Sequence, residues 1–214
     1  MEDLKIIGYY LCGTTNAPEW LRGVGERVLS VSGCIGELHP RPACFMGGWR
    51  RGEDREYQRA LMLDDRRYRE LSEEAARLFS LRRIDVDSRF LCPADARTFR
   101  HRFCRAIDCR VVSVSTTPEY FRVLAGEREG SHSGVPLGGE ADRGPWLGSD
   151  ILGWDICGFH SFLCNSLQQE LPEASFRDPG LLANDFSSVV RFARRIKGLG
   201  EPVVWLPCRI GDVT

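Results

Sequence analysis

Apolar residues recur along the chain with two different periods, which predict strands alternating with helices. The run from Lys5 to Cys12 (KIIGYYLC) and the alternating run from Cys109 to Ser115 (CRVVSVS) are typical of strands. A shorter run from Arg27 to Val31 is expected to pair with the first of these. Two more strands are predicted at Asp150 to Ile156 and in the segment VVWLPCRI that follows Pro202.

Helical spacing of apolar residues fills most of the first half between these strands. Glu53 to Ser80 predicts two helices, because Asp64 interrupts the apolar stripe. Pro93 suits the first turn of a helix that runs to about Ala106. Thr117-Pro118 has the residue types of a helix start and predicts a short helix through about Leu124.

Two helices are predicted in the second half of the chain. One begins near His160 and ends before Pro172, at about Leu171. The other is capped by Asn184 or Asp185 and continues to Lys197. In this last helix the apolar residues lie on one face, and the other face carries Ser187, Arg191, Arg194 and Arg195.

The order of these elements indicates an α/β or α+β fold. Because the connections have uneven lengths, we expect a mixed sheet flanked by helices. We expect one layered domain over residues 1–214. Residues 126–148 contain seven glycines and two prolines without apolar periodicity, which predicts a flexible Gly-rich loop.

Composition limits the classes of function. The 29 basic and 30 acidic residues give a net charge of -1, which does not favour a nucleic-acid or membrane partner. The apolar runs are too short for a membrane helix, and the first residues, MEDLKIIGYYLCG, lack a secretion signal. The nine cysteines include no C-x-x-C and are typical of reduced thiols. We therefore expect a cytoplasmic protein of bacterial type.

The candidate catalytic residues are His160, Cys164 and Asp155. On a helix that begins near His160, the imidazole shares one face with Cys164 and points inward, where a general base is placed. Cys164 or Cys12 is then the nucleophile, and Asp155 or Asn165 orients the imidazole. The alternative is a core histidine bonded to a backbone carbonyl or to Asp155.

The same segment has a spacing that zinc could use. Cys157, His160 and Cys164 form a C-x2-H-x3-C set, with Cys208 or Cys12 as a fourth ligand. The spacing does not match a paired-knuckle pattern. We therefore expect no metal and no cofactor, and we keep a small zinc-binding domain as an alternative.

Two further groups of residues are candidates for binding. Aromatic side chains in a desolvated patch often carry interface energy, although core packing remains the default interpretation, because each ring has a large area to bury: Trp154, Phe162 and Trp205. The polar face of the helix that begins at Pro93 is cationic and could hold a phosphate or an acidic partner, or form ordinary surface ion pairs: Arg97, Arg100, Arg102 and Arg105.

The sequence contains no cofactor fingerprint and no complete catalytic triad. It is therefore interpreted as a non-enzymatic, cytosolic protein-binding module, immunity-like in that it occludes a partner protein such as a toxin. One alternative is a Cys/His-dependent hydrolase or transferase centred on His160 and Cys164. The other is a small zinc-binding or phosphate-binding domain.

Overall fold

The computed structural model describes eight strands, four α-helices and two short 3-10 helices. The described residues are 3–17, 21, 23–32, 35, 58–85, 88–128, 137–139, 142–155, 158–165, 167–200 and 204–214. The strands are β1 (Lys5–Asn16), β2 (Arg27–Leu29), β3 (Cys109–Thr116), β4 (Trp146–Asp155), β5 (Gly158–Ser161), β6 (Phe176–Arg177), β7 (Leu181–Leu182) and β8 (Val204–Asp212). The helices are α3 (Asp65–Ser80), α4 (Pro93–Phe103), α5 (Pro118–Arg128), α6 (Phe186–Arg195), η1 (Phe162–Asn165) and η2 (Leu167–Glu170).

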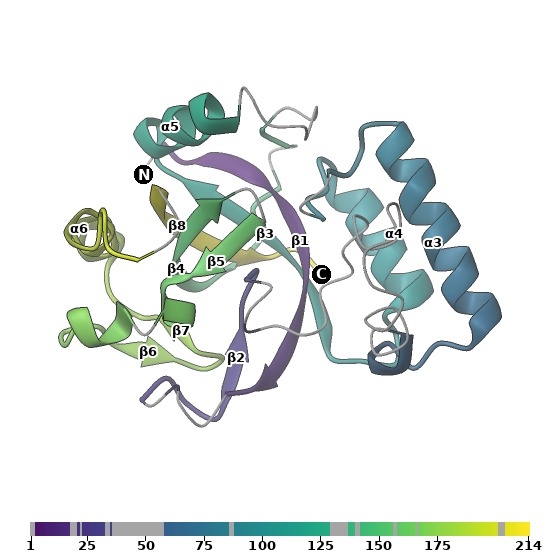
Figure 1. Cartoon of the computed structure of the whole chain (residues 1–214), viewed down its shortest axis with the longest axis horizontal. Coiled ribbons are helices and arrows are strands. Elements are labelled where there is room, and N and C mark those ends of the chain that lie inside the picture. Colours follow the sequence, from purple (N-terminus) through teal and green to yellow (C-terminus); the bar gives the residue numbers. More distant parts are fainter. Residues whose placement is uncertain are drawn as a thin grey trace.

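All eight strands belong to one sheet, in the order β2-β1-β3-β8-β4-β7-β6, with β5 paired to β4 (Figure 1). Every strand pair in the described part of the chain is antiparallel, so the expectation of a mixed sheet is wrong. Strand direction depends on which strands become neighbours, and β8 lies between β3 and β4, which precede it in the chain. The class is α+β, one of the two expected.

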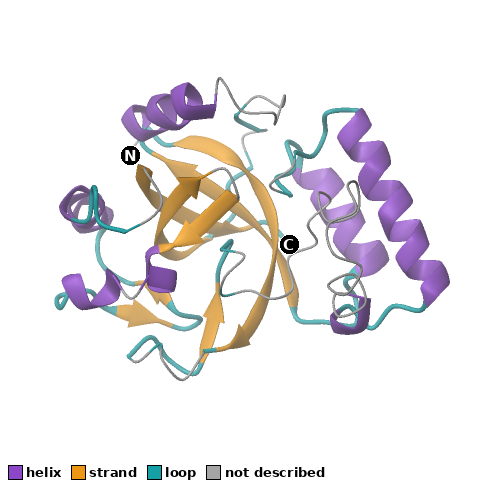
Figure 2. Ribbon diagram, in the orientation of Figure 1, coloured by secondary structure: helices purple, strands orange, loops and turns teal. Residues whose placement is uncertain are grey.

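Three clusters of buried side chains lie on the two faces of this sheet. The alternation along β8 explains the division, since Leu206, Cys208 and Ile210 enter one cluster and Trp205 enters another. The cluster that contains Leu206, Cys208 and Ile210, called the inner cluster below, also includes residues of β1, β3, β4 and β5. A second cluster lies beneath α3 and α4, and the third lies beneath α6. Figure 2 shows these helices on opposite sides of the strands.

Most predicted helices are confirmed, with small changes at their ends. Asp64 is the N-cap of α3, where its carboxylate accepts a hydrogen bond from the N–H of Arg67 at 2.7 Å. Pro93 begins α4, and Asp185 caps α6. The arginine-rich face of α6 is exposed, while its apolar face packs against β8 and β4.

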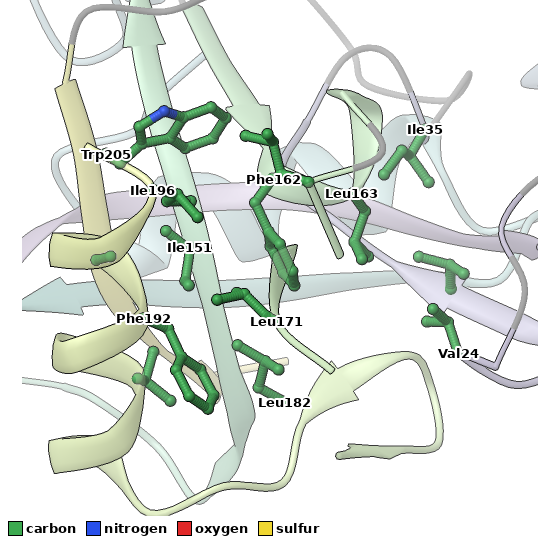
Figure 3. Close-up of a cluster of buried hydrophobic side chains, with 14 of the residues drawn as sticks. Val24, Ile35, Ile151, Phe162, Leu163, Leu171, Leu182, Phe192, Ile196 and Trp205 are labelled. Carbon is green, nitrogen blue, oxygen red and sulfur yellow. The ribbon is translucent and has the colours of Figure 1, made fainter. Parts of the chain in front are cut away.

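The predicted helix from His160 to Leu171 does not form. Residues Gly158–Ser161 pair with β4 as strand β5, and the chain then continues in the two 3-10 helices. The leucine spacing that suggested the helix still marks buried positions, because Leu163, Leu167 and Leu171 all enter the cluster beneath α6. Figure 3 shows Leu163 and Leu171 within this cluster. An i, i+4 spacing indicates burial on one side but does not distinguish an α-helix from successive 3-10 turns.

The Gly-rich segment is shorter than predicted at both ends. Helix α5 continues to Arg128, and β4 begins at Trp146. The predicted loop at 126–148 therefore lies partly within these elements, and residues 129–136 and 140–141 lie outside the described residues. Within the described ranges, every helix is too short or too polar to span a bilayer.

Candidate functional site

The structure puts the predicted catalytic residues on three consecutive elements. His160 lies on β5 opposite Gly153 of β4, and it is half-buried. Cys164 lies in η1, where its Sγ is 2.9 Å from the hydroxyl oxygen of the buried Ser32. Asp155 ends β4, and its side chain lies outside the described part of the structure. Cys164 therefore contacts a serine of the N-terminal third of the chain, which the sequence did not predict.

The cysteines of the zinc hypothesis lie in different clusters. Cys12 and Cys208 are buried in the inner cluster, whereas Cys164 packs against the cluster beneath α6. Cys157 lies outside the described residues. Among the residues that the structure describes, no three His, Cys, Asp or Glu side chains are arranged to hold a metal ion. Burial raises the pKa of both Cys12 and Cys208, which does not favour Cys12 as a nucleophile.

The predicted aromatic anchors lie mostly inside the molecule. Phe162 and Trp205 are 1% and 3% exposed in the cluster beneath α6. The Phe162 ring stacks on Phe176 at 6.3 Å, and Trp205 donates from Nε1 to the carbonyl oxygen of Leu199 at 3.0 Å. Trp154 is half-buried and packs against the inner cluster. In this structure the first two rings serve the core.

Each arginine of α4 binds a different part of the chain. Arg97 pairs with Asp142 at 2.6 Å, and Arg102 pairs with Glu74 of α3 at 3.4 Å. Arg100 donates to the carbonyl oxygen of Cys109, and Arg105, which lies just beyond the end of α4, contacts His101. The four guanidinium groups thus each have a different partner.

A cleft of about 470 Å³ lies where the first described residues meet the start of α5 and one face of α6. Figure 1 shows these two helices on the same side of the molecule, near the start of β1. The surface of the cleft is mainly apolar. Its lining residues come from three segments: Asp3 and Leu4, Thr117 and Pro118, and Phe186, Ser187, Val190, Arg191 and Arg194. Four of the α6 residues share one helix face, because they are spaced at i, i+3, i+4 and i+7: Ser187, Val190, Arg191 and Arg194.

The two arginines of this cleft differ in their partners. Arg194 is 3.6 Å from a carboxylate oxygen of Glu119, and both side chains are largely exposed. Burial raises the pKa of Tyr120, and the neighbouring Arg194 opposes that rise. Arg191 donates from Nη2 to the hydroxyl of Ser188 at 2.6 Å, and that hydroxyl in turn donates to the carboxylate of Asp185, whose pKa the charge of Arg191 helps to lower. Arg194 therefore has a direct ion pair, whereas Arg191 is linked to a carboxylate through the Ser188 hydroxyl.

A second unusual group lies in the interior. Asp150 of β4 is 4% exposed, and its Oδ1 accepts hydrogen bonds from the Ser161 hydroxyl at 2.8 Å and the Ile151 N–H at 2.7 Å. Burial raises the pKa of Asp150 to about 7. The carboxyl group belongs to the inner cluster, near the thiols of Cys12 and Cys208, so it affects stability and is not exposed to a partner.

Sequence patterns contained part of this information. The helical wheel placed Arg191 and Arg194 on the outer face of α6, but only the tertiary structure brings them to Thr117 and Pro118. The sequence did contain a signal that Asp150 is buried. Asp150 lies two residues before Leu152 on β4, so the two side chains face the same side of the sheet. The Ser32–Cys164 contact joins residues 132 positions apart, and nothing local indicates it.

Comparison with known proteins gives no relative, since no family model, no curated protein and no solved structure matches this chain.

Proposed function

We propose that this protein is a non-enzymatic binding module that holds an acidic, partly apolar segment of another protein in the cleft between α5 and α6. The observation that carries the proposal is the combination in one cleft of an apolar lining and two arginines, Arg191 and Arg194, on the same helix face. Interfaces of this kind use an apolar centre for affinity and charges at the rim for selection.

Charge complementarity supports an anionic occupant. Lys5 lies 3.5 Å from Asp3, so the carboxylate that lines the cleft already has a cationic partner. Arg194 pairs with the exposed Glu119 at 3.6 Å, and Arg191 reaches the carboxylate of Asp185 through the Ser188 hydroxyl. The lining is therefore positive in balance, and guanidinium groups bind carboxylates through two parallel hydrogen bonds.

The apolar side chains of the lining support a peptide over a fully charged ligand. Leu4, Pro118, Phe186 and Val190 all contribute to the surface of the cleft. A segment that carries Leu or Phe between Glu or Asp residues could bury its apolar side chains here and place its carboxylates on the arginines. An immunity-like role is one form of this function, in which the segment belongs to a toxin.

The test is a fluorescence-anisotropy titration with labelled peptides in which Glu and Asp alternate with Leu and Phe, and with the same peptides carrying Lys instead of the acids. We expect the acidic peptides to bind and the basic ones not to bind. R191Q/R194Q should weaken binding about tenfold or more, because charged hydrogen bonds contribute about 1.5–3 kcal/mol each. Higher salt should also weaken it.

A matched control is R66Q/R69Q, which removes two exposed arginines from α3, on the other side of the molecule (Figure 1). This variant should bind the acidic peptides like the wild type. Equal loss in both double variants would indicate a non-specific charge effect. A parallel titration with hexanoate tests a small-molecule ligand. If hexanoate binds and no peptide binds, the result contradicts a protein partner and favours a small carboxylic acid as the ligand.

His160 and Cys164 lie on successive elements, with the Cys164 sulfur against the Ser32 hydroxyl, and a Cys/His hydrolase stays an alternative. Arg97, Arg100 and Arg102 each have a different partner, which does not favour a shared phosphate site. The cleft is the feature that supports a function best.

A further inference from the structure

The surface next to the cleft carries a second element that a partner would meet. Trp146, the first residue of β4, is 38% exposed, which makes it one of five large apolar side chains on the described surface. The other four are Met62, Leu81, Val123 and Leu199. Exposed tryptophans at protein surfaces are enriched among the residues that dominate binding energy.

A continuous stack joins Trp146 to the cleft. The guanidinium carbon of Arg209 lies 5.6 Å from the centre of the Trp146 ring and 4.9 Å from the centre of the Phe186 ring. Phe186 is at the same time one wall of the cleft. The centres of the Trp146 and Phe186 rings are therefore separated by no more than the sum of these two distances. An extended segment of about four residues is long enough to span that separation.

The stack also fixes the indole before any partner arrives. Arg209 lies on β8, and its guanidinium carbon is within cation–π distance of both rings. A side chain that is already held in place loses less conformational entropy on binding. Trp146 is thus a partly exposed aromatic ring in contact with Arg209, which also contacts a wall of the cleft.

We propose that Trp146 is the second anchor of the same interface. In this arrangement, which rests on the function proposed above, the partner segment places its carboxylates on Arg191 and Arg194. It then extends over Phe186 to pack an apolar or aromatic side chain on the indole. The partner is therefore an extended segment with its acidic residues at one end and an apolar residue at the other.

The experiment uses the full chain labelled with 5-fluorotryptophan and a peptide with three acidic residues followed by Leu and Phe. The five tryptophans give separate ¹⁹F resonances, and W146F identifies the one from Trp146. We expect the Trp146 resonance to shift on titration, and we expect W146A to weaken peptide binding about tenfold. L81A is the matched control, because Leu81 is an exposed apolar residue at the end of α3, and it should bind normally.

The outcomes separate the two proposals. If the peptide binds in a manner that depends on Arg191 and Arg194, but W146A binds equally well and the Trp146 resonance does not move, the second anchor is wrong and the cleft function stands. If no acidic peptide binds the wild type, both proposals are wrong. Equal melting temperatures of W146A and the wild type show that a loss of binding is not a loss of folding.

Discussion

Arg89 and Asp85 form an ion pair that is completely buried, with 2.7 Å between Arg89 Nε and Asp85 Oδ2. Arg89 also donates from Nη1 to the carbonyl oxygen of Ile7 in β1, at 3.0 Å. The pair therefore attaches the segment before α4 to the first strand. Residue 8 must be glycine for this contact, because a Cβ at that position would overlap the Arg89 side chain.

Removing one partner of this pair should be costly. R89M leaves the Asp85 carboxylate buried without its cationic partner, and such changes cost about 3–5 kcal/mol of the free energy of unfolding. The double variant D85L/R89M removes both charges and should be more stable than R89M alone. Urea unfolding of the three proteins checks this. A double variant that is no more stable than R89M would show that the apolar pair packs badly or that the charge was not the cause.

Asp150 should make the stability of the protein fall as the pH rises. Its pKa is raised from 3.8 to about 7, so the folded protein keeps a proton that the unfolded chain releases. The stabilisation is complete below about pH 4 and is lost as the pH approaches and passes 7, at up to about 1.4 kcal/mol per pH unit.

The variant D150N isolates this effect, because the amide does not titrate and its oxygen can still accept from Ser161 and Ile151. Urea unfolding between pH 4 and pH 8 should show D150N gaining on the wild type as the pH rises, with the advantage largest at pH 8. E73Q, which changes an exposed carboxylate on α3, should follow the wild-type profile. A constant difference between D150N and the wild type would mean that Asp150 is ionised throughout.

Phe162 should behave as a core residue. Its ring is almost completely buried and stacks on Phe176, so F162A should lower the free energy of unfolding by about 3–5 kcal/mol. The measurement is urea unfolding combined with the peptide titration. A stable F162A that fails to bind peptide would instead make Phe162 an interface anchor.

The Ser32–Cys164 contact gives a test of the catalytic alternative. C164S keeps a group that can share a hydrogen bond with Ser32, whereas C164A removes it and should cost about 1 kcal/mol. In a binding module, both variants hold the acidic peptide as the wild type does. Rapid acylation of the wild-type protein by p-nitrophenyl acetate, abolished in C164S and in H160A, would support a Cys/His enzyme.

Secondary structure that depends on local signals was predicted correctly from the sequence. The prediction was wrong where pairing with a distant segment determines the secondary structure. Asp64, Pro93 and Asp185 mark helix starts that the structure confirms, because caps and first-turn prolines act on their own helix. His160 was assigned to a helix, but pairing with Gly153 across a reversal of the chain makes it part of a strand. Tertiary pairing here overrides the helical spacing of the leucines that follow.

The candidate site was less predictable for the same reason. Arg191 and Arg194 were correctly expected on an exposed helix face, yet their importance depends on Leu4 and Pro118, which come from distant parts of the chain. The arginines of α4 formed a denser pattern in the sequence, but contacts such as Arg97 with Asp142 engage them separately. Charge density along the sequence is therefore a poor guide to where charges remain available.

The most direct measurement is a map of amide chemical shifts of the ¹⁵N-labelled protein as the acidic peptide is added. We expect the changes to gather at residues 3–4, 117–118 and 186–194, and to be lost in R191Q/R194Q. Changes that gather instead around residues 158–165, or on the arginine face of α4, would contradict the assignment of the binding site to this cleft.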